Sequence, residues 1–213
     1  MKTIVSLIIL YLLGPSDFRR RQGRQNAERN QIQQIYTAEL GVREKTGKND
    51  GVRVEKYLRH VGLKKGDPWC AAFVCWVLDE AGVANPRTGW SPGLFPRSKV
   101  VWERDRKVAG GRVAGKEVAV AGKEVAVAGE KVAVAGGRKV GAERSLPQKG
   151  DVFGIWFPDK GRIAHVGFVD SWSDKWLITV EGNTNEAGSR EGDGVLRKRR
   201  LVRTVYQVSQ FID

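Results

Sequence analysis

The sequence is organised around residues 66–82, which read GDPWCAAFVCWVLDEAG. The Pro68-Trp69 loop predicts that a helix begins near Cys70, and Gly82 is a residue type that commonly follows the end of a helix. The segment between them is apolar nearly all round, whereas a helix at a protein surface shows a single apolar stripe. We therefore predict a central, buried helix over residues 70–81.

Two amphipathic helices are predicted before this one, over 26–40 and 52–61, because apolar residues recur there at helical spacing. After residue 150 the pattern changes to that of strands. Turn residues divide this part into five predicted strands: 152–157, 163–172, 176–181, 195–201 and 205–211. Helices followed by a meander predict an α+β fold, with N-terminal helices packed on an antiparallel sheet of about five strands.

Residues 107–144 interrupt this pattern with a low-complexity segment of Val, Ala, Gly, Lys and Glu. A seven-residue unit recurs over 116–122, 123–129 and 130–136. Each unit contains a Gly, lacks Leu and places Val two residues from Val, which argues against a coiled coil. We interpret the segment as a surface insertion, because loops gain length at a small cost in free energy. Residues 26–213 are then a single domain, interrupted once.

The N-terminus has an apolar run from Ile4 to Leu13, preceded by Lys2. The run has the length of a signal-peptide core and is too short to span a bilayer. Arginines follow at 19–21, and no small-residue cleavage site is evident. We interpret residues 1–25 as a signal peptide or a flexible basic N-terminus. Export to the cell envelope or periplasm is expected, with a cytoplasmic location or a phage-type lysin as the alternative.

The chain is strongly basic: its 213 residues carry a net charge of +13, with a pI near 10.0. Such a charge favours an anionic partner, namely nucleic acid, membrane or cell-envelope polymer. The charge is spread over 1–35, 107–144 and 197–200, and the last run is interpreted as a solvated edge strand. No nucleic-acid-binding motif occurs. A nucleic-acid-binding protein is thus an alternative, but no nucleic-acid partner is expected.

Two cysteines and two histidines limit the chemistry of thiols and imidazoles to Cys70 or Cys75 with His60 or His165. Their spacing does not suggest a structural zinc site, and we expect no metal. Cys75 lies inside the predicted helix and is expected to fill the core. A disulfide to Cys70 is not expected, because five helical steps separate the two Cα atoms by about 7.5 Å. His60 ends a predicted helix, where it can bond the last carbonyls.

Cys70 and His165 are the candidate nucleophile and base. Cys70 stands at the start of the central helix, where unpaired N–H groups and the helix dipole lower a thiol pKa, although a buried structural thiol is the alternative. His165 lies in an otherwise apolar strand, where it needs a polar partner. The next predicted strand ends at Glu181, followed by Gly-Asn-Thr-Asn. A carboxylate or amide there would hold the imidazole in one tautomer.

Four motifs, in this order, resemble those of the CHAP family of cysteine, histidine-dependent amidohydrolases and peptidases: PWCAAFV at 68–74, GDV at 150–152, AHVG at 164–167 and VEGN at 180–183. The resemblance covers most of the domain and implies a papain-like α+β fold. It implies that Cys70 is the nucleophile, His165 the general base, Glu181 the orienting acid and Asn183 a further polar member of the site. The implied activity is hydrolysis of amide bonds in bacterial peptidoglycan.

Peptidoglycan is then the expected partner of a monomeric enzyme that needs no cofactor. Trp69, beside Cys70, and Trp156, in the strand before His165, are the candidate cleft residues for sugar and stem peptide. The residues leave open whether the enzyme is an amidase, which frees the peptide from the sugar, or an endopeptidase. A catalytically silent wall-binding module of the same fold is the alternative, because residue identity shows neither thiolate geometry nor access to the cleft.

Overall fold

The computed structural model describes residues 15–104, 137–139, 146–186 and 192–212. The apolar run Ile4–Leu13 and most of the repeat segment lie outside the described residues. Helices come first: α1 (Pro15–Ala38), α2 (Val52–His60) and α3 (Cys70–Glu80), followed by the 3-10 turn η1 (Ser91–Leu94). The strands are β1 (Val100–Arg104), β2 (Gly137–Lys139), β3 (Val152–Phe157), β4 (Arg162–Trp172), β5 (Trp176–Thr184), β6 (Gly194–Leu201) and β7 (Gln207–Ser209), with 3-10 turns η2 (Pro158–Lys160) and η3 (Val202–Thr204).

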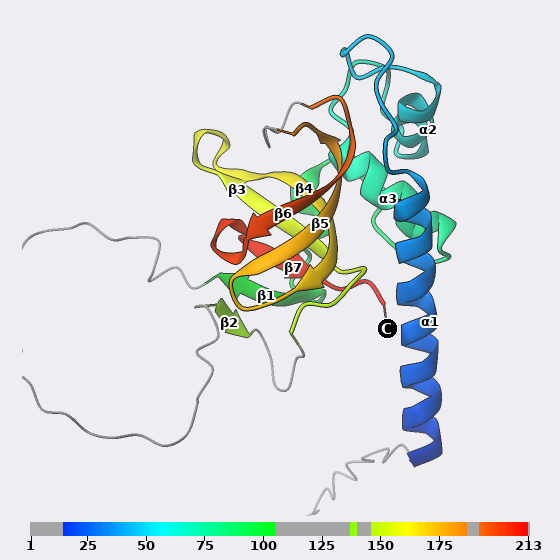
Figure 1. Ribbon diagram of the computed structural model, residues 1–213, viewed down its shortest axis with the longest axis vertical. Coiled ribbons are helices and arrows are strands. Elements are labelled where there is room, and N and C mark those ends of the chain that lie inside the picture. The colour runs from blue at the N-terminus through cyan, green and yellow to red at the C-terminus, as the bar shows by residue number, and fades with distance from the viewer. Residues whose placement is uncertain (1–14, 105–136, 140–145, 187–191, 213) are drawn as a thin grey trace, which may run out of the picture.

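The prediction of an α+β fold with an antiparallel sheet is confirmed. Within the described residues the sheet has seven strands in the order β2-β1-β7-β3-β4-β5-β6, and neighbouring strands pair antiparallel (Figure 1). The predicted count of about five strands was too low. β1 was not predicted, and β2 lies inside the segment interpreted as an insertion. Their pairing with each other and with β7 extends one edge of the sheet.

α1 begins well before the predicted residue 26 and includes residues 15–25. This N-terminal part is exposed and extends beyond the rest of the domain (Figure 1). A helical stretch without a buried face carries no apolar stripe, so periodicity gave no sign of it. Among the described residues, no helix is both long and apolar enough to cross a membrane.

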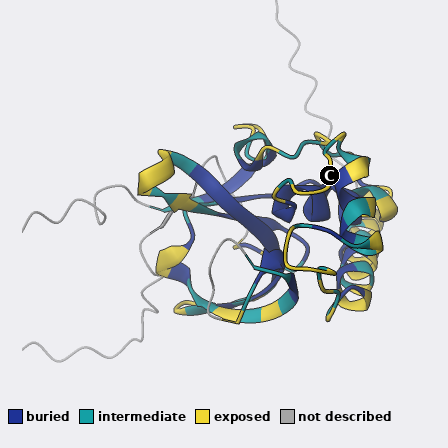
Figure 2. Cartoon of the chain, turned by 90° about the horizontal axis from the view of Figure 1, so that it is seen from above, coloured by how far each residue is buried: buried dark blue, intermediate teal, exposed yellow. Residues whose placement is uncertain are grey.

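α3 is the buried helix that the sequence predicts. Its residues from Cys70 to Leu78 are all buried, and Gly82 follows with a left-handed φ of 71°. α3 lies between the sheet and the other two helices, in contact with β4 and β5 on one side and with α1 and α2 on the other (Figure 1). Buried residues gather where these layers meet, whereas the outer face of α1 is exposed (Figure 2). The first residue of α3 is thereby placed against the sheet.

Candidate active site

Cys70 opens α3 and faces the sheet with its thiol almost completely buried, at 5% exposure. Its Sγ lies 3.7 Å from Oγ of Ser91 in η1. Burial raises the pKa of the Cys70 thiol, but hydrogen bonding and charge interaction with His165, helped by Ser91 and the backbone of Val166, outweigh burial and lower the pKa below its ordinary value. The contact with His165 therefore favours a thiolate.

His165 lies on β4 at 1% exposure, and its Nε2 is 2.8 Å from Oε2 of Glu181 on β5. Nδ1, which has no conventional hydrogen-bond partner among the described residues, is left to face Cys70. Burial lowers the pKa of His165, but its interactions with Cys70 and Glu181 raise it to about 9. The directions of the two shifts favour a thiolate on Cys70 opposite an imidazolium on His165.

Glu181 is completely buried. Besides His165, two further side chains bind its carboxylate. Arg200 on β6 donates to both carboxylate oxygens, with Nη2 2.6 Å from Oε2, and the hydroxyl of Thr179 donates to Oε1. Burial raises the pKa of Glu181, but Arg200 and His165 lower it far below its ordinary value. The carboxylate is thus ionised in the folded protein at neutral pH.

Arg200 is the site residue that the sequence analysis missed. The run 197–200 was interpreted as a solvated edge strand, yet the side chain of Arg200 is only 13% exposed. The register of β5 and β6 explains the difference: Thr179 pairs with Lys198 and Leu177 with Arg200, so Arg200 projects to the same face as Glu181. The sequence did contain a signal: side chains alternate between the two faces of a strand, so Lys198 and Arg200 share one face while Arg197 and Arg199 share the other.

Asn183 lies beyond Glu181, with a left-handed φ of 55° where the register of β5 with β6 shifts. In the amide orientation that satisfies both groups, its oxygen accepts from the backbone N–H of Trp69 at 3.1 Å and its nitrogen donates to the carbonyl of Gly192 at 2.7 Å. Both polar groups are therefore committed to the main chain. Asn183 positions the residue before Cys70.

The two tryptophans predicted to line a cleft have different environments. Trp69 is completely buried: its ring stacks on Tyr57 at 5.7 Å, and its Nε1–H donates to Glu44 at 2.8 Å. Trp69 is a core residue, and its assignment to the cleft was wrong because the start of α3 faces inward. Trp156 is 37% exposed and lies against Tyr206, so it is available to a ligand. Trp90 was not singled out, but it precedes Ser91 and is 54% exposed.

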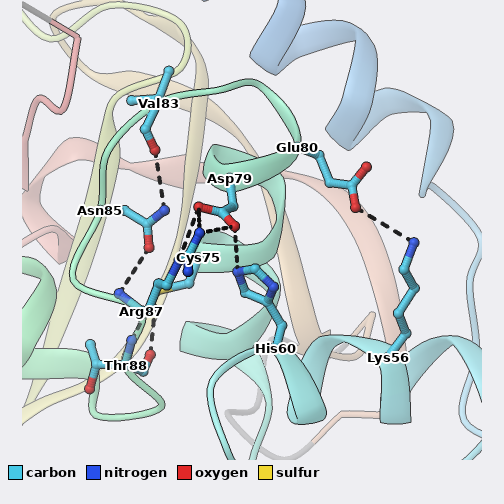
Figure 3. A network of polar contacts seen from close by, with 9 residues as sticks. All are labelled: Lys56, His60, Cys75, Asp79, Glu80, Val83, Asn85, Arg87 and Thr88. Carbon is cyan, nitrogen blue, oxygen red and sulfur yellow. Dashed lines mark hydrogen bonds and ion pairs between the residues drawn. The ribbon is translucent and has the colours of Figure 1, made fainter.

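Cys75 and His60 lie in a separate network of polar contacts that spans α2, α3 and the loop after α3 (Figure 3). Cys75 is buried and accepts the backbone N–H of Thr88, and burial raises its thiol pKa to about 11. Its predicted role in the core is confirmed, and both cysteines are free. The imidazole of His60 lies 3.3 Å from a carboxylate oxygen of Asp79, which also binds Arg87, rather than on the last carbonyls of α2.

The glycines of the AHVG and VEGN motifs allow the strands and α3 to approach closely. A Cβ at Gly167 would lie 2.8 Å from the carbonyl oxygen of Val180 and 2.9 Å from Cγ of Glu181. A Cβ at Gly182 would lie 2.7 Å from the ring of Trp69. Both distances are shorter than a carbon atom tolerates. Gly167 thus admits the side chain of Glu181 beside His165, and Gly182 admits the residue before Cys70.

We expect Gly167→Ala to lower the free energy of unfolding by about 2 kcal/mol, because the added methyl meets a strand carbonyl that cannot move alone. Urea unfolding measures this change. Gly23→Ala is the matched control: it adds the same methyl in α1, where nothing lies within 4 Å, and should be neutral or slightly stabilising. Equal stability of the Gly167 variant and wild type would contradict the packing described for this motif.

The Cys70 thiolate should be visible by its ultraviolet absorbance near 240 nm. At pH 7, Cys70→Ala is expected to remove the absorbance of about one thiolate, because His165 lowers the Cys70 pKa. Cys75→Ala should leave the signal unchanged, because the raised pKa of Cys75 keeps that thiol protonated. His165→Ala should abolish the signal at pH 7, since burial alone raises a thiol pKa. Identical spectra of wild type and Cys70→Ala would refute the ion pair between the Cys70 thiolate and the His165 imidazolium.

The arrangement supplies what acyl transfer needs: a thiolate, an acid and base in contact with it, a buried carboxylate that orients the imidazole, and the positive end of a helix. Among the described residues, no group of three or more His, Cys, Asp and Glu side chains is placed to hold a metal ion. Comparison with protein-family models, with curated proteins and with solved structures yields no match. The chemistry assigned to the site therefore depends on its geometry and on the four sequence motifs.

Proposed function

We propose that the protein is a cysteine-dependent peptidoglycan hydrolase, an amidase or an endopeptidase, with the papain-like arrangement of the CHAP family. One observation carries the proposal. Cys70 begins a buried helix against His165, whose far nitrogen lies 2.8 Å from the buried carboxylate of Glu181. A structural thiol needs neither a basic imidazole nor an ionised carboxylate behind it, since burying these groups costs free energy.

In the proposed reaction, the Cys70 thiolate attacks the carbonyl carbon of an amide, and backbone N–H groups at the start of α3 stabilise the oxyanion. His165 donates its Nδ1 proton to the leaving amine as the C–N bond breaks, which leaves a thioester and a neutral imidazole. Water then attacks the thioester carbon and gives its proton to His165. The C–S bond breaks, and the thiolate–imidazolium pair is restored while Glu181 remains ionised.

Peptidoglycan is proposed as the substrate on three grounds. Three of the four CHAP-like motifs, those at 68–74, 164–167 and 180–183, supply the residues that the fold brings together at this site. The net charge of +13 favours encounter with an anionic envelope polymer. The exposed rings of Trp156 and Trp90 offer apolar faces to sugar or peptide. Export, which such a substrate requires, is proposed from the apolar run Ile4–Leu13.

A catalytically silent wall-binding module of the same fold is a second candidate, and it is favoured by the burial of the site. Cys70 is 5% exposed and His165 is 1% exposed, whereas a nucleophile must reach its substrate. The polar groups of the site would then only stabilise the fold. A single experiment separates the two candidates.

The test incubates wild type and Cys70→Ala with several peptidoglycan types and identifies the soluble products by mass spectrometry. Stem peptides without sugar, released by wild type only, would identify an amidase. Shortened or uncrosslinked muropeptides would identify an endopeptidase. If no peptidoglycan type yields a product that depends on Cys70, the proposed hydrolase is refuted and the silent module is favoured.

The hydrolysis rate should depend on pH through the Cys70–His165 pair. As the pH rises through about 9, His165 loses the proton that the leaving amine requires, so the rate should fall. As the pH falls below the lowered pKa of Cys70, the thiolate is protonated and the rate should fall again. The measurement is kcat/KM as a function of pH, with protein stability checked at each point. A rate that keeps rising well above pH 9 would contradict this assignment of acid and nucleophile.

A further inference from the structure

A polar cavity of about 380 Å³ is lined in part by Asn183 of the proposed site. One wall comes from the loop between α1 and α2, and the other from the end of β5 and the residues between β5 and β6. The described residues that line it are Glu44, Gly47, Asn49, Pro68, Asn183, Asn185, Gly192 and Asp193. Pro68 is two residues before Cys70, and Asn183 is two residues after Glu181. A group in this cavity would be close to an amide bound at Cys70.

The carboxylate of Glu44 is fixed in this cavity by two neutral donors. Its Oε1 accepts from the indole N–H of Trp69 at 2.8 Å, and its Oε2 accepts from the backbone N–H of Asn49 at 2.8 Å. Among the described residues, Glu44 forms no ion pair. Each oxygen keeps a lone pair for a further donor. The cavity thus contains a negative charge that is held in place before any ligand arrives.

The remaining lining residues strengthen this character. Asp193 adds a second carboxylate, which is half-exposed and paired with Arg43 outside the lining. The side-chain oxygen of Asn49 is a further acceptor, since the amide nitrogen of that side chain donates to the carbonyl of Gly66. No cationic side chain is among the described residues that line the cavity, although Lys198 donates to the backbone carbonyl of Asn185 beside it. The carboxylate of Glu44, which has no ion-pair partner among the described residues, would repel an anion and attract an ammonium group.

We propose that the cavity binds a primary ammonium group of the substrate peptide, with Glu44 as its main partner. The inference depends on the proposed hydrolase and narrows its substrate class to peptides that carry a free amine close to the scissile amide. An ammonium has three N–H donors, which the carboxylates of Glu44 and Asp193 and the side-chain oxygen of Asn49 can accept. The hydrogen bond from the indole N–H of Trp69 to Glu44 also connects the cavity to the residue before Cys70.

The test compares one soluble stem peptide containing a diamino acid in three forms: free amines, dimethylated amines and acetylated amines. Dimethylation keeps the positive charge, whereas acetylation removes it. Wild type is expected to show a kcat/KM about 10-fold or more higher for the two charged forms than for the acetylated form. Glu44→Gln, which keeps the shape but loses the charge, should reduce this ratio to nearly one. Glu80→Gln is the control, since it removes an exposed carboxylate that pairs with Lys56 in the network of Figure 3.

Equal kcat/KM for all three forms with wild type would overturn the inference, and this comparison needs no variant to fold. An equal loss on all three forms with Glu44→Gln would overturn it as well, because Glu44 would then act only through Trp69. Calorimetric binding of the same peptides to Cys70→Ala separates the two proposals. Binding that depends on the charged amine, without hydrolysis by wild type, refutes the hydrolase but supports the ammonium site. Hydrolysis at a rate that does not depend on the charge of the amine supports the hydrolase but refutes the ammonium site.

Discussion

Replacing Cys70 with alanine is expected to lower the rate of amide hydrolysis by about 10⁴-fold or more, while the protein stays folded. The thiol is the only nucleophile that lies against His165 in the proposed mechanism, so its loss removes the covalent step. The substitution deletes one sulfur from a buried position and should lower the free energy of unfolding by only about 1 kcal/mol. Product release from peptidoglycan measures the first effect, and urea unfolding measures the second.

Cys75→Ala is the matched control for this result. It removes the same sulfur from the same helix, at a position that is also buried, but there the thiol contacts the backbone of Thr88 and has a raised pKa. The control should keep nearly full activity and show a similar small loss of stability. An active Cys70→Ala protein would refute Cys70 as the nucleophile. Inactivation by both substitutions alike would show that packing in α3, and not thiol chemistry, determines activity.

The convergence of Cys70, His165 and Glu181 was predictable because each residue lies in a segment with a strong local pattern. The apolar stretch after Cys70 identifies a central helix, and the apolar runs around His165 and Glu181, bounded by turn residues, identify two neighbouring strands. A short turn at Ser173-Asp174 makes those strands antiparallel partners, so both polar residues fall near one end of α3. Local periodicity and short connections were sufficient to predict this part of the site.

Features that depend on contacts distant in sequence were not predictable in the same way. Arg200 reaches Glu181 only because β6 pairs with β5 in one particular register, and its own run resembles a solvated strand. Trp69 was assigned to a cleft from its position beside Cys70, but its indole finds Tyr57 and Glu44 across the core. β1 pairs with β7 at the far end of the chain. In each case tertiary contacts, not local propensity, determine the environment.

Arg200→Met should have the largest effect on stability among these substitutions, lowering the free energy of unfolding by about 3 kcal/mol at neutral pH. The variant keeps an unbranched side chain of similar length but removes the cation that binds both oxygens of Glu181, which has no exposure to water. The remaining partners, His165 and Thr179, do not replace a bidentate guanidinium. Arg197→Met is the control on the same strand, because Arg197 is 45% exposed and its pair with Asp170 should contribute less than about 1 kcal/mol.

The pH dependence of this difference follows from the direction of the Glu181 pKa shift. In wild type the folded pKa of Glu181 lies below its ordinary value of 4.5, so the stability it contributes is present above that pH and is lost as the pH falls through the folded value. Without Arg200, burial raises the Glu181 pKa, and the variant binds a proton at higher pH. The gap between Arg200→Met and wild type should therefore be widest near neutral pH and should narrow in acid.

A double-mutant cycle with Glu181→Gln isolates the pair itself. If Arg200 acts through Glu181, the two substitutions should cost less together than the sum of the single losses, with a coupling free energy of about 2 kcal/mol. Glu181→Gln alone should also weaken the thiolate absorbance at pH 7, because a neutral amide no longer supports the imidazolium of His165 opposite Cys70. Additive losses, or an Arg200 variant as stable as the Arg197 control, would show that Arg200 does not act through Glu181. Arg200 would then contribute no more to stability than its exposed neighbour Arg197.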